Sequence, residues 1–240
     1  MDMQKISNRI FYLPSMEETD RPVLGYIKGD RYSLMVDAGN SPKHVSLYNT
    51  ALEKVGLPSP DYVAITHWHW DHTYGICAVE GKVIASRLTN EELKKMMLWN
   101  WTDDAMAERL QNGEDIEFCD NCIRLEYPNC SEINVQTADI IFDKSLTIDL
   151  GGIHCELIHI GGPHSDDSVA IYVPEEKVIF ISDADCEDYY FNNGLYNKEK
   201  LENLIEVLKK IDFKTYIRGH DVTHTRSEAL DSLEKELRKL

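Results

Sequence analysis

The chain has 240 residues and a formal net charge of −17, with 42% hydrophobic and 28% charged residues. This length allows one large domain or two small ones, and the composition is that of a globular protein with a sizeable core. The acidity argues against a nucleic-acid partner, which needs a basic surface, and no stretch approaches the ~18 apolar residues that span a membrane.

The N-terminal sequence and the cysteines bear on the compartment. From Met1 to Pro14 there is no basic start followed by a long apolar core, so we expect no secretory signal and a cytoplasmic protein. Six cysteines are too few for a disulfide scaffold at this length, and we expect thiols. Cys119 and Cys122, with Cys130 nearby, resemble half of a zinc ribbon, but a closed site needs a second pair, which the chain lacks. We therefore favour loop and core cysteines.

Short apolar runs and one helical pattern make up the first part of the chain. The runs have the length and residue types of strands, and they cover residues 9–13, 23–27, 32–36, 62–66 and 83–86. A helical pattern from about Pro42 to Val55 ends at a glycine-then-proline stop signal. Thr89 and Glu92 have the spacing of a capping box, which predicts a helix from there to about residue 101.

The segment from about 91 to 138 is the least regular part of the chain. It is acidic beyond Asp103, and its periodicity is weak. We expect one or two helices and loops, inserted over one edge of the core, and we expect substrate choice to lie there. Trp99 and Trp101 could line an apolar pocket, although core packing is the favoured interpretation.

Strands resume after this segment, and two further helices follow them. The predicted strands cover residues 139–142, 146–148, 154–159, 168–173, 178–182 and 216–217. Residues 198–211 are amphipathic, and a second capping box, Thr225 with Glu228, opens a C-terminal helix. Two strand-rich stretches, each followed by helix, predict an α+β protein in which two sheets pack face to face with helices outside. We expect a single domain over 1–240.

A cluster of histidines follows the predicted strand at 62–66. His67, His69, Asp71 and His72 place three histidines and an aspartate within six residues. Imidazole is the usual nitrogen ligand of zinc. Alternate residues of an extended loop point the same way, so His67 and His69 can share one ion, while Asp71 and His72 serve a second ion. A histidine-rich surface loop is the alternative, but four ligand-type residues directly after a strand argue against it.

Three more candidate ligands lie far along the chain, each at a predicted strand-to-loop junction. His164 lies between two predicted strands, Asp183 ends the apolar run 178–182, and His220 follows Gly219 after the strand at 216–217. A turn aspartate is the alternative for Asp183, because Asp185 lies close by.

The His-x-His-x-Asp-His pattern with single downstream His, Asp and His residues resembles the metallo-β-lactamase-fold superfamily. Asp37-Ala38-Gly39 resembles the aspartate–glycine turn of that family, and the likeness runs from about Arg9 to His220. The resemblance implies a four-layer αβ/βα sandwich with metals at one edge between the sheets. Ser182 stands where the family usually has glycine.

Carried over by position, the resemblance implies two metal sites. The first metal is expected on His67, His69 and His164, and the second on Asp71, His72 and His220, with Asp183 bridging the two. Two zinc ions suit this ligand set best, although iron or manganese would fit. A bridging hydroxide would attack the substrate, Asp71 would orient it as the catalytic residue, and Asp37 is a candidate partner for a ligand histidine.

The expected function is a zinc-dependent hydrolase acting on an ester, thioester, lactone or phosphoester of a small molecule. Asp183, where the common true β-lactamases of this fold carry cysteine, points toward the other hydrolytic branches. Two alternatives stay open: a non-catalytic metal-binding or sensor protein of the same fold, and a nuclease or phosphodiesterase-type relative, which the net charge disfavours. The oligomeric state is not readable from the sequence.

Four aromatic residues near the expected metals are candidates for substrate contacts. Trp68 and Trp70 alternate with the ligands, and Tyr74 and Tyr190 could donate to a substrate oxygen. Packing that orients the ligand loop is an equal alternative for the tryptophans, and a partly buried ring is the favoured alternative for the tyrosines.

Overall fold

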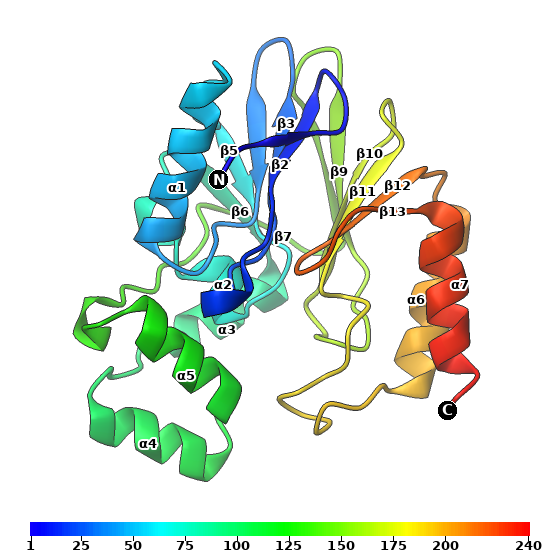
Figure 1. The fold of residues 1–240 in the computed structure, drawn as a ribbon. Coiled ribbons are helices and arrows are strands. Elements are labelled where there is room, and N and C mark those ends of the chain that lie inside the picture. Colours follow the sequence, from blue (N-terminus) through cyan, green and yellow to red (C-terminus); the bar gives the residue numbers. More distant parts are fainter.

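The computed structural model describes residues 1–240. Two β-sheets pack face to face, and helices cover their outer faces, which gives the expected four layers (Figure 1). Helices α1 and α3 lie on one side of the sandwich, α6 and α7 lie on the other, and two further helices, α4 and α5, extend from one end. The prediction of an αβ/βα sandwich is confirmed.

The first sheet has seven strands in sequence order, so each strand lies beside the next one along the chain. β1 to β4 pair antiparallel, and β4 to β7 pair parallel. The strands are β1 (Gln4–Lys5), β2 (Ile10–Leu13), β3 (Leu24–Lys28), β4 (Ser33–Val36), β5 (Tyr62–Ala64), β6 (Lys82–Ser86) and β7 (Ile140–Phe142).

The second sheet has six strands in the order β13-β12-β11-β10-β9-β8. All of its strand pairs are antiparallel except β11 with β12, which are parallel and are connected by α6. The strands are β8 (Ser145–Asp149), β9 (His154–His159), β10 (Val169–Val173), β11 (Val178–Ser182), β12 (Thr215–Arg218) and β13 (His224–Thr225).

The helices complete the outer layers and the insertion. The α-helices are α1 (Pro42–Lys54), α2 (Trp70–Thr73), α3 (Arg87–Met96), α4 (Asp103–Asn112), α5 (Glu117–Glu126), α6 (Lys198–Lys210) and α7 (Arg226–Leu237). Three short 3₁₀ turns are η1 (Glu17–Thr19), η2 (Ile76–Ala78) and η3 (Cys130–Glu132). No helix is long and apolar enough to cross a membrane.

Helix starts follow side-chain caps, with one correction to the sequence prediction. The α7 capping box of Thr225 and Glu228 is present as predicted. The expected box at Thr89 is absent, because Ser86 caps α3 and accepts a hydrogen bond from the Thr89 amide. The cap therefore lies three residues earlier than predicted, and the helix begins at Arg87, directly after β6.

Three apolar clusters hold the layers together. One fills the space between the two sheets, with Ile27, Leu157 and Phe180 among its members. Another joins the first sheet to its helices and to the inserted helices, and the third joins the second sheet to α6 and α7. Because both faces of both central sheets are buried, the strand ends are held rigidly, and loops at those ends can carry a site.

A buried ion pair fixes the inserted helices to the N-terminal part of the chain. The Arg21 guanidinium donates to Glu126, at the end of α5, over 2.7 and 2.9 Å, and Thr19 and Ser41 donate to the same carboxylate. Helix α5 thereby lies beside η1 at the end of the sandwich (Figure 1).

Candidate metal centre

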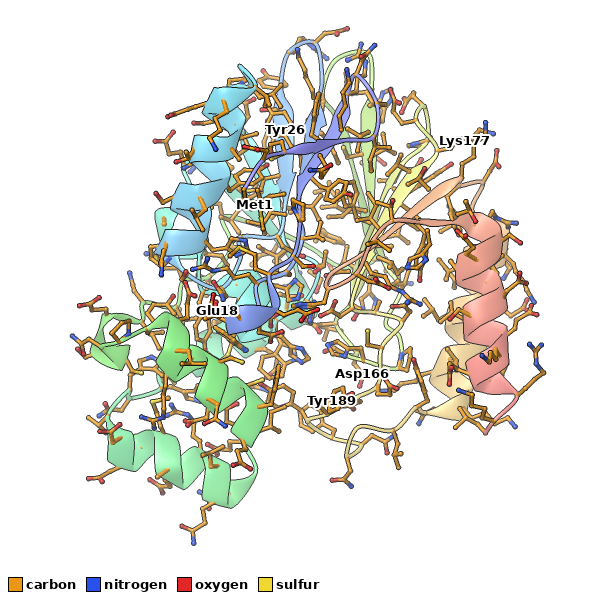
Figure 2. All side chains as sticks on the ribbon, in the orientation of Figure 1. Met1, Glu18, Tyr26, Asp166, Lys177 and Tyr189 are labelled. Atoms are coloured by element: carbon orange, nitrogen blue, oxygen red, sulfur yellow. The ribbon has the colours of Figure 1, made fainter.

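The candidate ligands meet at one end of the sandwich. His67, His69, Asp71 and His72 follow β5, His164 precedes β10, Asp183 follows β11 and His220 follows β12. All seven of the predicted residues come together there. Figure 2 shows Glu18, Asp166 and Tyr189 toward this end, and Tyr26 and Lys177 toward the other. The clustering arises because the segments from both sheets reach the same edge.

Two backbone features allow this approach. Gly219 lies so close to Asp183 that a Cβ atom on residue 219 would be 2.0 Å from Asp183 Oδ1. Only glycine therefore fits before His220. Ser182 has φ 53°, a left-handed conformation that favours glycine. Its hydroxyl lies 3.3 Å from Asp37 Oδ2, and this contact ties the turn after β11 to the turn after β4.

The first group consists of His67, His69 and His164. Their ligand atoms all lie within 4.8 Å of one another, and all three side chains are buried. His164 Nδ1 donates to the Glu187 carbonyl over 2.7 Å, which leaves Nε2 as the lone-pair nitrogen, 2.9 Å from His69 Nδ1. His67 Nε2 is buried and has no hydrogen-bond partner.

The second group consists of Asp71, His72, Asp183 and His220. His72 Nε2 lies 2.8 Å from Asp71 Oδ2 and 3.1 Å from Asp183 Oδ2. His220 Nε2 lies 3.0 Å from Asp71 Oδ2 and 3.4 Å from Asp183 Oδ2. Four ligand atoms from three segments, α2 and the turns after β11 and β12, thus converge on one point.

Asp183 lies between the two groups. Its Oδ2 contacts both histidines of the second group and is also 4.0 Å from His164 Nε2 in the first. Asp185 takes a different role, because it accepts hydrogen bonds from Tyr216 and from Arg218 and is fully engaged in the second sheet. The geometry therefore favours Asp183 over Asp185 as the shared ligand.

Asp37 and Thr66 fix which nitrogen of two histidines carries the proton. His72 Nδ1 donates to Asp37 Oδ2 over 2.8 Å, which leaves Nε2 to face Asp71 and Asp183. The Thr66 hydroxyl donates to Asp37, so it accepts from His67 Nδ1 at 3.1 Å. His67 Nε2 is then the free lone pair. The expectation that Asp37 supports a ligand histidine is confirmed in its geometry.

Burial and charge act differently on the two groups. Burial holds the pKa of His67 and of His69 well below the usual range, so both rings are neutral, as metal ligands must be. Burial would also lower the pKa of His72, but the carboxylates of Asp71, Asp37 and Asp183 raise it well above that range. The second group therefore concentrates negative charge where a cation would be stabilised.

The ligand atoms fit a bound metal in three respects. His67 Nε2 is a buried nitrogen without a partner, which is costly unless something binds it. His69 Nδ1 and His164 Nε2 face each other at 2.9 Å, an arrangement that a shared cation would satisfy. Two carboxylate oxygens converge on one imidazole nitrogen of His72. Nitrogen and carboxylate donors of this kind suit zinc, and iron or manganese less specifically.

A cavity of about 120 Å³ opens onto these groups. The inserted helix α5 and the loop after β11 form one side of it, and the ligands form the other. Its lining consists of Asp20, His69, Asp71, Ile116, Phe118, Cys119, His164, Asp183, Tyr189, Tyr190 and His220. The inserted segment thus lies against the candidate site, as its sequence led us to expect.

The four aromatic candidates for substrate contact separate into three cases. Tyr190 lines the cavity, and its ring centroid lies 4.8 Å from that of His69. Trp68 packs edge-on against His69 and lines a neighbouring cavity instead. The expectation for Trp70 and Tyr74 needs correction, because they are only 2% and 1% exposed and belong to the apolar cluster beneath the ligand loop.

Several residues at the site escaped the sequence predictions. Asp20 lies 3.5 Å from His220 Nδ1, and burial, together with the charge of Asp71, raises its pKa to about 7. Phe118 also lines the cavity. Neither residue follows a strand or belongs to a ligand motif, so no local signal marks it. The ion pair of Arg21 with Glu126, which holds α5 beside the cavity, likewise joins residues far apart in the sequence.

The cysteines do not form a metal site. All six are free thiols, and neither group of potential ligands includes one. Cys119 and Cys122 are buried on α5, and burial raises the pKa of the Cys122 thiol to about 11. Both side chains belong to the apolar cluster that joins the first sheet to the inserted helices.

Comparison with known proteins adds a family match. A family model described as "Metallo-beta-lactamase superfamily" matches residues 23–220, which include all seven candidate ligands. No curated protein matches the chain.

Solved structures of similar fold are numerous. A metallo-beta-lactamase from Pontibacter korlensis superposes with a TM-score of 0.68 at 18% identity, over 100% of this chain and 99% of that one. A stereoselective inverting sec-alkylsulfatase, Pisa1, from Pseudomonas sp. gives 0.69 at 16%, over 98% of this chain but 41% of the other. A metallo-beta-lactamase family protein from Thermus thermophilus gives 0.68 at 14%, over 98% and 81%. At these identities the likeness concerns the fold.

Proposed function

The chain belongs to the metallo-beta-lactamase superfamily, and on that premise we propose that it is a metal-dependent hydrolase. Its substrate would be a small molecule with an ester, thioester, lactone or phosphoester bond. The observation that carries this proposal is the convergence of seven buried or half-buried ligands in two adjoining groups, with Asp183 between them. A structural metal site would need only one closed group of four ligands.

Each group would hold one divalent ion. His67, His69 and His164 would bind the first, and Asp71, His72 and His220 the second, with Asp183 shared. Zinc suits this mixture of imidazole and carboxylate best. Divalent ions bound in this way lower the pKa of water and polarise a carbonyl or phosphoryl oxygen.

The side chains of the protein supply orientation and proton transfer. Burial would raise the pKa of Asp71, but His72 and His220 lower it below the usual range, so its carboxylate is ionised and can orient the attacking water through a hydrogen bond. Because it is a weak base, it would relay rather than hold the proton of that water, which passes to the oxygen or sulfur that leaves. Tyr190 covers one side of the ligands and limits the access of other water.

A small-molecule substrate agrees with the charge and size of the site. The net charge of −17 disfavours nucleic acid, and a cavity of about 120 Å³ admits only the reacting part of a substrate. Phosphodiesters of nucleic acids therefore rank below esters, thioesters and lactones.

A second candidate function is metal binding without turnover, as in a sensor or scaffold. The observation that favours it is the cavity itself, because about 120 Å³ is below the roughly 300–1,000 Å³ of ordinary ligand sites. A hydrolase with this cavity must bind most of its substrate at the rim or move Tyr189 and Tyr190 aside.

Hydrolysis of p-nitrophenyl acetate and of bis(p-nitrophenyl) phosphate, with and without a chelator, separates the two candidates. The hydrolase proposal predicts turnover that chelation abolishes and added zinc restores. His67→Ala should abolish it as well, whereas the matched variant His154→Ala, at an exposed histidine paired with Glu175, should not. Bound metal without turnover on a broad panel of esters would favour the sensor.

A further inference from the structure

We propose that the substrate carries no anionic group apart from the bond that is cleaved, and that its variable part is apolar, with or without a positive charge. This inference rests on the proposed hydrolase function and concerns the same cavity. It follows from the charges that surround the ligands and from the side chains at the rim, which are separate from the metal-binding groups.

Apart from the ligand histidines, the cavity lining has no basic side chain, and it contains neither lysine nor arginine. Asp20 is a carboxylate outside the ligand set, and the rest of the non-ligand wall consists of Ile116, Phe118, Cys119, Tyr189 and Tyr190. A substrate carboxylate or phosphate normally pairs with arginine or lysine. No residue in this lining can provide that pairing.

The basic residues of the surrounding turns are already paired. The Arg21 guanidinium, next to Asp20 in sequence, is buried against Glu126 at 2.7 Å. Arg218, two residues before His220, donates to buried Asp185 at 2.8 Å. Neither can turn toward the cavity without leaving a buried carboxylate unpaired, which is costly.

The two inserted helices α4 and α5 also have no free cation for the cavity. Arg109 is buried, and its guanidinium lies over the rings of Trp99 and Trp101, at 4.5 and 4.7 Å. Arg124 pairs with Asp103 and Asp120. The loop from β11 to α6, between Asp183 and Asn197, contains no lysine or arginine.

The neighbouring cavity extends the negative charge. It measures about 400 Å³, and its only basic residue, Lys200, pairs with Asp166 at 2.7 Å. Several of its lining residues are next in sequence to residues of the metal cavity, such as Trp68 beside His69, so the same segments line both cavities. Its lining is Trp68, Leu88, Glu92, Ser165, Asp166, Asp167, Asp188, Phe191 and Lys200.

The rim of the metal cavity is apolar and exposed. Phe118 on α5 is 58% exposed, and Tyr189 on the loop after β11 is 54% exposed. Figure 2 shows Tyr189 at the end of the sandwich, beside the inserted helices. Aromatic side chains held in water at the mouth of a site favour an apolar or cationic group over an anion.

Cations bound by the ligands would act on the bond that is cleaved, whereas the rest of the substrate faces the rim. An additional negative charge there approaches Asp20 and the carboxylates of the neighbouring cavity, with no free lysine or arginine to compensate it. Each close like-charge contact weakens binding several-fold even in water, so two such contacts give an expected penalty of at least about tenfold. The penalty should shrink as salt screens the charges.

Three p-nitrophenyl esters of equal chain length test the inference on the metal-loaded protein. They are the neutral hexanoate, the anionic monoadipate and the cationic 4-(trimethylammonio)butyrate. We expect kcat/KM for the anionic ester to be at least about tenfold below that for the neutral ester, and the cationic ester to match or exceed it. The corresponding p-nitroanilides, titrated by calorimetry, give the same comparison as binding affinities without requiring turnover.

Two lysine variants on one helix provide a matched control. Phe118→Lys places a cation at the rim and should raise the anionic-to-neutral ratio of kcat/KM several-fold. Leu125→Lys makes the same charge change on α5 at a residue that is 65% exposed and does not line the cavity, and the ratio should stay unchanged. Circular dichroism confirms that both variants are folded.

The outcomes separate this inference from the function on which it rests. Metal-dependent hydrolysis in which the anionic ester equals or exceeds the neutral one overturns the inference and leaves the hydrolase proposal standing. Absence of hydrolysis for all esters overturns the proposed function, and the anilide affinities then still decide the charge preference. Tight binding of the anionic anilide would refute it in either case.

Discussion

Replacing Asp37 with asparagine changes one atom of the group that orients two candidate ligands. Asp37 is buried and accepts from the Thr66 amide at 2.8 Å and from His72 Nδ1 at 2.8 Å. Its φ of 60° is tolerated by asparagine as well as by aspartate, so the backbone should hold. The substitution therefore tests hydrogen bonding rather than packing.

The asparagine side chain can satisfy only one of these two partners as before. If its oxygen stays with the Thr66 amide, its NH₂ faces His72 Nδ1, and the ring proton must move to Nε2. That proton occupies the nitrogen that faces Asp71 and Asp183, and it blocks metal binding there. If the amide flips, the buried Thr66 N–H loses its acceptor, which costs about 1–3 kcal/mol.

We predict that Asp37→Asn weakens the second metal about 10- to 100-fold, or about 1.4–2.7 kcal/mol, and spares the first. Competition with a chromophoric zinc chelator measures both affinities. Asp61→Asn is the control, because Asp61, just before β5, makes a similar 2.8 Å contact to the Ser33 amide at the start of β4, remote from the ligands. Unchanged binding of both metals by Asp37→Asn would refute the reasoning.

Three further predictions address the first metal, the insertion and pH. Thr66→Val removes the hydroxyl that fixes His67 and should weaken the first metal about tenfold more than the second in the same titration; equal effects would contradict the assignment. Glu126→Gln leaves Arg21 buried without its carboxylate and should lower the free energy of unfolding by about 3–5 kcal/mol in urea; a loss under about 1 kcal/mol would show that the pair does not anchor α5. Burial raises the pKa of Asp115 from 3.8 to about 6, so its ionisation destabilises the fold as pH rises through that window. Asp115→Asn should therefore be more stable than the parent protein at pH 8, by up to about 3 kcal/mol, with the difference vanishing toward pH 4, and a constant difference would refute it.

The strands and the ligands were predictable because their signals are local. The apolar runs at 154–159 and 178–182 coincide with β9 and β11, and the ligand motif follows β5 as expected. Each candidate ligand stands where a strand meets a loop, and the structure brings all seven together. Short strands such as β13 were not predicted, since a two-residue strand is defined by its partner rather than by its own sequence.

The features that were missed depend on contacts between distant segments. Trp70 and Tyr74 lie next to ligands in sequence, but the single turn of α2 points them into the core. Asp20 reaches His220 only because η1 folds against α5. Ser86 caps α3 in place of the predicted Thr89, because both residues carry a hydroxyl group and β6 ends at Ser86. Sequence periodicity contains none of this information.

Elemental analysis of metal per chain, on freshly purified protein before and after chelation, tests the central claim most directly. The seven converging ligands predict about two divalent ions per chain, lost on chelation and restored by zinc. One ion would show that the Asp71, His72 and His220 group is not a site of its own. No bound metal, even after zinc is added, would contradict the account of this end of the sandwich as a metal centre.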